Sequence, residues 1–219
     1  RLQTNYICLY QAHRDDEEAP QDETLEAFDR LVKAGKVRAI GASNFSPGRL
    51  KSSLEVSAAK GLARYETIQP KFNLFDRSEV EGALADLTRA EGVGVIPFYG
   101  LAAGFLTGKY RTEADFEGKA RASTIKREYW NDKGRAVLAA LDAAADEVGA
   151  SPAQVALAWI MAHPAITAPL ASATVSGLVA VNMAASDNVG VVRADLKVNG
   201  TVVATDASAP FGFTWDSAG

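Results

Sequence analysis

Residues 5–42 read NYICLYQAHRDDEEAPQDETLEAFDRLVKAGKVRAIGA and contain the unit that decides the fold. Residues 5–12 are rich in Tyr, Ile and Leu, a composition typical of a buried strand. A helix is predicted next, ending near Gly35 because glycine readily adopts the left-handed conformation that stops a helix. Residues 37–42 predict a second strand. The segment is therefore a β–α–β unit, which favours a parallel sheet. The apolar face of its helix consists of Leu25, Phe28, Leu31 and Val32.

The same alternation of strands and helices continues to residue 171, which predicts the α/β class. Residues 98–131 hold four glycines and predict a long irregular stretch, which in compact domains is usually functional or disordered. Ser151, Pro152 and Gln154 form a helix-start pattern, with Ser as N-cap and Gln three residues later. The other expected elements are helices at 47–60, 78–90, 132–147 and 152–162 and strands at 65–69, 93–97 and 166–171.

The composition and the hydrophobic pattern of the sequence change near residue 173. Residues 192–198 alternate apolar and polar side chains, as in a half-buried strand. Asn199-Gly200 joins them to residues 201–205, a strong hairpin signal, and residues 211–215 predict one more strand. We therefore expect two domains: residues 1–173, which are α/β, and residues 174–219, a short all-β segment.

Composition excludes several classes of function. The 219 residues are 47% hydrophobic and 23% charged, with a net charge of −4, so no basic surface for nucleic acid or an acidic membrane is expected. No apolar run is long enough for a membrane span, and none resembles a signal peptide. A single cysteine, Cys8, fits a reducing compartment such as the cytoplasm. With only Cys8, His13 and His163 available, no zinc-ligand spacing is present.

Five motifs resemble, in order and spacing, the aldo-keto reductase family. They are LYQAHRDD (9–16), AGKVRAIGASNFS (34–46), IQPKFNLFDR (68–77), GVGVIPFYGLAAGFLTGKY (92–110) and SPAQVALAWIMAHPAITAPLASA (151–173). The resemblance implies a (β/α)₈ TIM-type barrel of which residues 1–173 are strands four to eight. It also implies NADPH as cofactor and a small aldehyde or ketone as substrate. The tail, through SDNVGV, VNGTVVATD and FTWD, resembles bacterial immunoglobulin-like modules, whose relatives are mostly extracellular.

Several strand ends carry polar residues that the resemblance assigns to the site. His13 follows the first strand, where barrel enzymes place catalytic groups, and the resemblance makes it the catalytic histidine that hydrogen-bonds the substrate carbonyl. Without the resemblance, a histidine at the end of a strand more often has only a local role, with its hydrogen bonds made to nearby backbone. Ser43, Asn44 and Gln69 end the next two strands, and the resemblance assigns them to the nicotinamide carboxamide; by themselves, such residues are ordinary turn chemistry.

Further cofactor contacts are implied after residue 97. Phe98 stands where the family stacks a ring on the nicotinamide, although the neighbouring Tyr99 leaves open which ring does so. Residues 101–109 form a glycine-bearing loop suited to approach a diphosphate. The resemblance assigns cofactor contacts here and beyond to Leu101, Gly104, Leu106, Lys109, Arg121 and Ser172. The acidic run at residues 15–18 predicts a solvated loop.

The family's reaction also needs a tyrosine, a lysine and an aspartate, which lie on segments before the fourth barrel strand. These 219 residues do not include them, so we expect the isolated chain to be weak or inactive as a reductase. The open sheet edges and an apolar barrel interior predict self-association. Two alternatives stay open: a non-catalytic chimeric scaffold or interaction module, and a different barrel enzyme, a lyase or isomerase, using His13 with Lys109.

Overall fold

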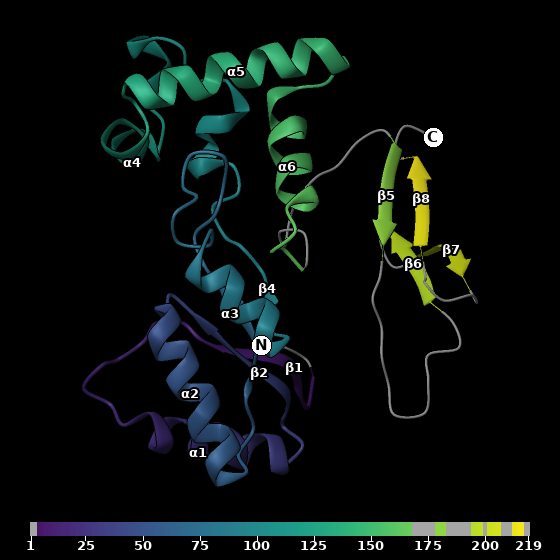
Figure 1. Ribbon diagram of the computed structural model, residues 1–219. Coiled ribbons are helices and arrows are strands. Elements are labelled where there is room, and N and C mark those ends of the chain that lie inside the picture. Colours follow the sequence, from purple (N-terminus) through teal and green to yellow (C-terminus); the bar gives the residue numbers. More distant parts are fainter. Residues whose placement is uncertain (1–3, 168–177, 183–193, 199–200, 207–211, 217–219) are drawn as a thin grey trace. The chain divides into compact units, whose positions relative to one another are not determined.

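The computed structural model describes residues 4–167, 178–182, 194–198, 201–206 and 212–216 (Figure 1). The chain divides into two units, Arg1–Ala171 and Ser172–Gly219. Among the described residues, no helix is both long and apolar enough to cross a membrane.

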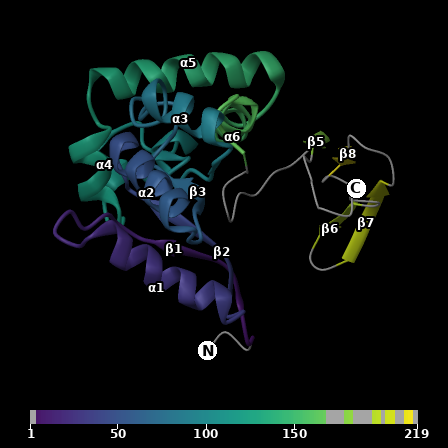
Figure 2. The same ribbon diagram turned by 60° about the horizontal axis from the view of Figure 1, so that its bottom comes forward.

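A four-stranded parallel sheet organises the first unit. Its strands are β1 (Ile7–Ala12), β2 (Val37–Ser43), β3 (Tyr65–Gln69) and β4 (Gly94–Val95), in the order β1-β2-β3-β4. Successive strands are neighbours, as expected for repeated β–α–β units. Figure 2 shows the N-terminal pair β1 and β2 beside α1. The prediction of an α/β fold with a parallel sheet is confirmed.

Helices α1 (Gln21–Lys33) and α2 (Pro47–Lys60) begin and end where the sequence predicts. The Ser46 hydroxyl accepts a hydrogen bond from the Arg49 N–H at 3.3 Å, which satisfies one of the free N–H groups at the start of α2. Gly61 ends α2 with φ +63°, a conformation that costs glycine little. Of the apolar face predicted for α1, Leu25 is fully buried, while Phe28, Leu31 and Val32 pack against the same core.

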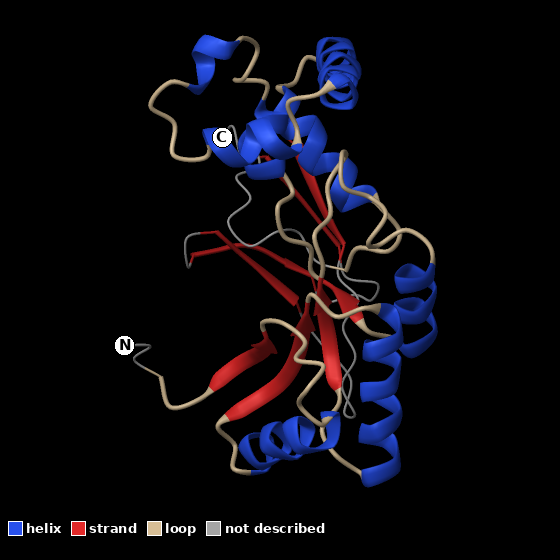
Figure 3. Ribbon diagram, turned by 90° about the vertical axis from the view of Figure 1, so that its left-hand side faces the viewer, coloured by secondary structure: helices blue, strands red, loops and turns tan. Residues whose placement is uncertain are grey.

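The two faces of the sheet differ in chemistry. Ala42, Ile68 and Val95 are in register on one face and are buried in the core cluster with the helices, which lie along one side of the strands (Figure 3). Because side chains alternate along a strand, the neighbouring row faces the other way. That row consists of Gln11, Gly41, Thr67 and Gly94. It is small and polar, so for this row the expectation of an apolar interior is wrong.

The chain after β4 forms a second apolar cluster around five helical segments. They are η1 (Ala102–Thr107), η2 (Glu113–Phe116), α4 (Ala122–Glu128), α5 (Asp132–Val148) and α6 (Pro152–Ala162). The cluster includes Phe105, Leu106, Ile125 and Tyr129, all fully buried or nearly so. The expectation of an entirely irregular stretch over residues 98–131 is therefore wrong, because this apolar packing stabilises α4 and two short 3₁₀ turns. The predicted capping box of Ser151 and Gln154 is confirmed.

Four predicted elements differ from the structure. Strand β1 begins at Ile7 rather than at residue 5. Helix α3 spans Ala83–Glu91 rather than 78–90, because Gly82 has φ +98° and so separates the preceding turns from the helix. Strand β4 stops before Pro97, which lacks an N–H group for the ladder. In the expected strand 166–171, only residues 166–167 are described and neither is in a strand. Thr167 nevertheless continues the sheet, since its N–H donates to the Val95 carbonyl at 3.1 Å.

The described elements of the second unit are four strands. They are β5 (Leu178–Asn182), β6 (Ala194–Val198), β7 (Thr201–Asp206) and β8 (Gly212–Asp216). β5 pairs with β8 and β6 with β7, both antiparallel. Phe211 and the predicted turn at Asn199-Gly200 lie outside the described residues.

Gly41 makes a testable prediction about the sheet. A Cβ atom at this position would lie 2.3 Å from Thr67 Oγ1 and 3.2 Å from the Thr67 carbonyl oxygen. We expect Gly41→Ala to lower the free energy of unfolding by about 1–3 kcal/mol, the usual cost of overpacking, as measured by urea denaturation.

Gly48→Ala is the matched control, because a Cβ at Gly48 meets nothing within 4 Å and alanine is the better helix former. It should leave stability unchanged or raise it slightly. Equal effects of the two substitutions would contradict the close approach of β2 and β3.

Candidate active site

The carboxyl ends of the parallel strands bring five predicted residues to one edge of the sheet. His13 follows β1, Ser43 ends β2 and is followed by Asn44, Gln69 ends β3, and Phe98 follows β4. Parallel strands place these ends side by side, which is where α/β proteins commonly bind ligands.

Hydrogen bonds join the first three strand ends. Asn44 Nδ2 donates to the His13 carbonyl oxygen and to Ser43 Oγ, both at 2.9 Å. The buried Ser43 hydroxyl in turn donates to the Gln69 carbonyl oxygen at 2.9 Å. Asn44 has φ +57°, a conformation that asparagine tolerates better than most residues. The backbone after β1 is thus fastened to β2, while the His13 side chain is exposed.

The two candidate rings adjoin this edge. The Phe98 N–H donates to the Pro70 carbonyl at 2.9 Å, and the Phe98 carbonyl accepts from the Phe72 N–H at 3.2 Å. Phe98 is half-buried, and its ring meets the Tyr99 ring edge to face at 5.4 Å between centroids. Tyr99 is 45% exposed. Both rings therefore have free surface at the candidate site.

The predicted diphosphate loop is compact and partly buried. The Gly104 N–H donates to the Leu101 carbonyl at 2.8 Å, and Gly104 has φ +98°. Lys109 folds over Gly104, since a Cβ there would lie 3.6 Å from Lys109 Nζ. Leu106 is fully buried in the second cluster, so its side chain belongs to the core, and its N–H donates to the Leu101 carbonyl at 3.2 Å.

Arg121 lies just before α4 and is exposed. Ile125 of the same helix packs in one cluster with Phe105 and Leu106 of the loop, which fixes α4 beside it. Ser172 lies outside the described residues.

Asp15 corrects the prediction that residues 15–18 are merely solvated. Arg49 binds it with two hydrogen bonds, Nε to Oδ2 at 2.6 Å and an Nη to Oδ1 at 2.9 Å. The Asp15 side chain is only 12% exposed. This ion pair fastens the loop that follows His13 to the first turn of α2.

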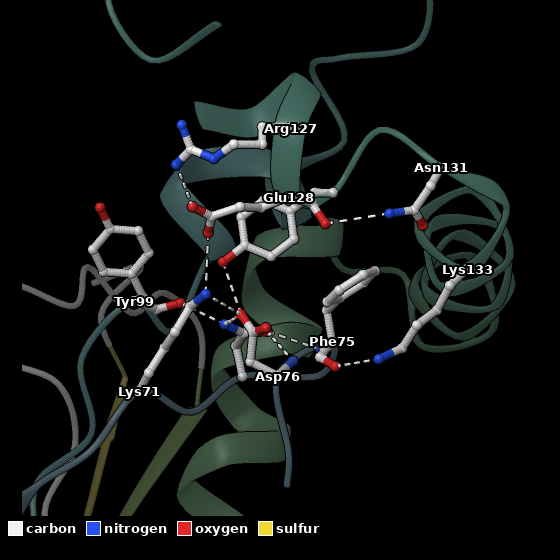
Figure 4. A network of polar contacts seen from close by, with 10 residues as sticks. Lys71, Phe75, Asp76, Tyr99, Arg127, Glu128, Asn131 and Lys133 are labelled. Carbon is white, nitrogen blue, oxygen red and sulfur yellow. Dashed lines mark hydrogen bonds and ion pairs between the residues drawn. The ribbon is translucent and has the colours of Figure 1, made fainter. Parts of the chain in front are cut away.

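A polar network that the sequence did not reveal surrounds Asp76 (Figure 4). Its carboxylate accepts from Tyr129 OH at 2.7 Å and Asn73 Nδ2 at 2.9 Å, and its Oδ2 lies 3.2 Å from Lys71 Nζ. Lys71 also pairs with Glu128 at 3.1 Å. The network ties the segment after β3 to the end of α4.

This network combines a tyrosine, a lysine and an aspartate, but it is unsuited to proton donation. Tyr129 is fully buried. Burial, together with the hydrogen bond to Asp76, raises the pKa of Tyr129 above its ordinary value. Burial alone would lower the pKa of Lys71, but its contacts with Tyr129, Glu128 and Asp76 raise it. An inaccessible tyrosine with a raised pKa is a weak acid, so the network is structural.

The residues at the sheet edge fit a nicotinamide dinucleotide. Within the described part of the chain, Asn44 Oδ1 and the Gln69 side-chain amide have no hydrogen-bond partner, and such groups can pair with both the donor and the acceptor of a carboxamide. In the same part, neither Lys109 nor Arg121 has an ion-pair partner. Both cations are therefore available to phosphate. No cluster of three or more His, Cys, Asp or Glu able to hold a metal occurs among the described residues.

Comparison with known proteins agrees with this geometry. The profile of the Aldo/keto reductase family matches residues 1–193. This chain belongs to the aldo/keto reductase family. The match passes the boundary expected at residue 173, and the comparisons give no support to an immunoglobulin-like tail.

Individual relatives cover the same region. The chain is 38% identical over 173 residues to the uncharacterized oxidoreductase YrpG of Bacillus subtilis, covering 78% of this chain and 50% of that protein. It is 30% identical over 198 residues to the L-glyceraldehyde 3-phosphate reductase of Escherichia coli K12, covering 86% and 56%. The glycerol dehydrogenase AKR11B4 of Gluconobacter oxydans has a similar fold, with a TM-score of 0.64, 30% identity and coverage of 75% and 49%. The chain thus spans about half the length of these relatives.

The Arg49–Asp15 pair supports a prediction about the loop after His13. Arg49→Lys keeps the charge but loses the two-pronged geometry. We expect it to lower the free energy of unfolding by about 0.5–1 kcal/mol and to speed amide hydrogen exchange in residues 13–18.

Lys51→Gln is the control, since Lys51 and its partner Glu55 are both largely exposed. It should change stability by less than about 0.5 kcal/mol and leave exchange in residues 13–18 unaltered. Normal exchange there in Arg49→Lys would show that the ion pair does not hold the loop.

Proposed function

We propose that the chain is an oxidoreductase-derived domain that binds NADPH at the carboxyl edge of its sheet and is weak or inactive as an aldehyde or ketone reductase when alone. The observation that carries this proposal is the set of hydrogen bonds from Asn44 to His13 and Ser43, which unites the histidine with the carboxamide-type groups.

Each residue has a distinct role in the proposed site. NADPH, when bound at this site, would supply a hydride to the carbonyl carbon of the substrate. The exposed His13 imidazole hydrogen-bonds the carbonyl oxygen of a small substrate and orients it. Ser43, Asn44 and Gln69 orient the nicotinamide through its carboxamide, and Phe98 or Tyr99 covers one face of its ring.

The phosphates are bound further along the chain. The backbone around Gly104 approaches the diphosphate, and Lys109 with Arg121 supplies positive charge. The family's tyrosine, lysine and aspartate are not among these 219 residues. Without a tuned proton donor, a rate loss of about 10²–10⁴ is expected.

NADPH binding by the 219-residue chain tests the proposal. Titration should give saturable quenching of NADPH fluorescence. Phe98→Ala and Tyr99→Ala identify the stacking ring, because loss of an aromatic stack worth about 0.5–1.5 kcal/mol raises the Kd roughly two- to tenfold.

Tyr6→Ala is the matched control, since Tyr6 precedes β1 and so lies at the opposite end of the sheet from the site. Its Kd should equal that of the unaltered chain. No quenching at millimolar NADPH would refute cofactor binding. Rapid aldehyde-dependent NADPH oxidation would refute the claim that the isolated chain is impaired.

A second candidate function is that of a non-catalytic scaffold or interaction module that self-associates. The observation that favours it is the edge of β1, which among the described residues pairs only with β2. An unpaired edge offers N–H and C=O groups to another strand. One relative, 30% identical over 192 residues, is named a probable voltage-gated potassium channel subunit beta, from Oryza sativa. We also propose a cytoplasmic location, which the single cysteine fits. An immunoglobulin-like tail is proposed from the sequence motifs of the last 45 residues alone.

Light scattering tests self-association. At tens of micromolar we expect a mass above that of the 23.2 kDa chain, falling on dilution. Cys8→Lys places a charge on the exposed side of the edge strand and should favour the monomer, whereas Cys8→Ser should not. A monomer at all concentrations would contradict association through this edge.

A further inference from the structure

Asn73 is the most connected side chain of the segment between β3 and α3. It is completely buried. Its Oδ1 accepts the N–H groups of Phe75 at 2.8 Å and Asp76 at 2.9 Å. These two donors fix the orientation of the amide, so that Nδ2 points the other way. Nδ2 donates to Asp76 Oδ2 at 2.9 Å and to the Tyr99 carbonyl oxygen at 3.0 Å.

The segment that Asn73 contacts is strained. Tyr99, Ala102 and Ala103 have φ values of +61°, +49° and +57°, which side chains other than glycine rarely adopt. Such conformations persist only where the surroundings hold them, and they concentrate at ligand-binding sites. The Asn73 side chain donates to the carbonyl oxygen of Tyr99, at the start of this segment.

The charged groups of the network hold Asn73 in turn. Asp76 is fixed by Tyr129 and Lys71 as well as by Asn73. Lys71 continues the chain of contacts to Glu128 at the end of α4. The segment 99–104 and the helix that follows Arg121 are therefore both attached to the turn around Asn73.

We propose that Asn73 is a positioning residue that holds residues 99–104 in the conformation that receives the diphosphate of the dinucleotide. This inference rests on the proposed function. It adds the residue that holds the phosphate-binding loop, residues 99–104, in place before the ligand binds. A loop ordered before binding spares the ligand the cost of ordering it. Loss of the Asn73 donor should therefore weaken dinucleotide binding. It should also speed amide hydrogen exchange in this loop of the ligand-free protein.

Asn73→Asp tests the proposal, because it keeps the Oδ1 acceptor and removes the Nδ2 donor. At pH 7.5 we expect the Kd for NADPH to rise about three- to tenfold, because the hydrogen bond to the Tyr99 carbonyl is lost together with that to Asp76 Oδ2. Amide exchange in residues 99–106 should be faster in the free protein. Ser57→Ala is the matched control, since it removes a hydrogen bond from another buried side chain to a backbone carbonyl, that of Ala63 at 3.1 Å, outside this network. It should retain nearly normal NADPH affinity.

The pH dependence separates positioning from a general loss of structure. The introduced carboxyl faces the Asp76 carboxylate and the Tyr99 carbonyl, with Lys71 nearby and Tyr129 and Glu128 beyond. Burial and the neighbouring carboxylate raise its pKa, whereas the N–H groups of Phe75 and Asp76 and the charge of Lys71 lower it. Once protonated at acidic pH, its single O–H replaces one of the two lost hydrogen bonds. The ratio of variant to unaltered Kd should fall toward one. A merely destabilised protein would show no such recovery.

Each other outcome is decisive. Normal exchange in residues 99–106 of Asn73→Asp, or faster exchange with unchanged NADPH affinity, overturns the inference, and so does a Kd ratio that does not depend on pH. If the unaltered chain binds no NADPH, the proposed function fails and the diphosphate role fails with it. The exchange data then still decide whether Asn73 holds the loop.

Discussion

The parallel hydrogen bonding of β1 to β4 is the constraint on which the rest of the first unit depends. It brings four loops that are distant in sequence to one edge, so His13, Asn44, Gln69 and Phe98 become neighbours. It also sets the two faces of the sheet in register. One face packs with the helices as the core, while the other carries the row from Gln11 to Gly94, where the missing Cβ of Gly41 admits the Thr67 hydroxyl.

Polar groups that contact no proposed ligand hold the loops at this edge of the sheet. Arg49 and Asp15 hold the loop after His13, and Asn73 and Asp76 hold the backbone around Tyr99. Ion pairs and strained backbone both need a supporting structure to persist. The helices therefore contribute more than a covering for the sheet. Arg49 of α2 binds the loop after His13, and Glu128 of α4 pairs with Lys71 of the network around Asn73.

The sequence predicted the elements whose signals are local. Gly35, Gly61 and the Ser151 capping box mark helix ends through backbone geometry that a few residues determine. It failed where distant contacts decide the outcome. Ile125 of α4 is buried in one cluster with Phe105. Asp15, within the acidic run, pairs with Arg49, which lies 34 positions away in the sequence. The roles of Lys71, Asn73 and Asp76 were hidden within the motif IQPKFNLFDR, because nothing local links them to residue 99 or 129.

The sequence by itself determined the α/β class, the order of the first three strands and the identities of the candidate site residues, because periodicity, glycine positions and family motifs are written along the chain. Only the tertiary structure decided how those residues are held. It showed that the Leu106 side chain is core and that Asn44 joins His13 to Ser43. It also showed that a buried asparagine donates to the carbonyl of Tyr99, a residue with left-handed backbone. Such facts depend on contacts between residues far apart in sequence, which the packing of the sheet and helices alone creates.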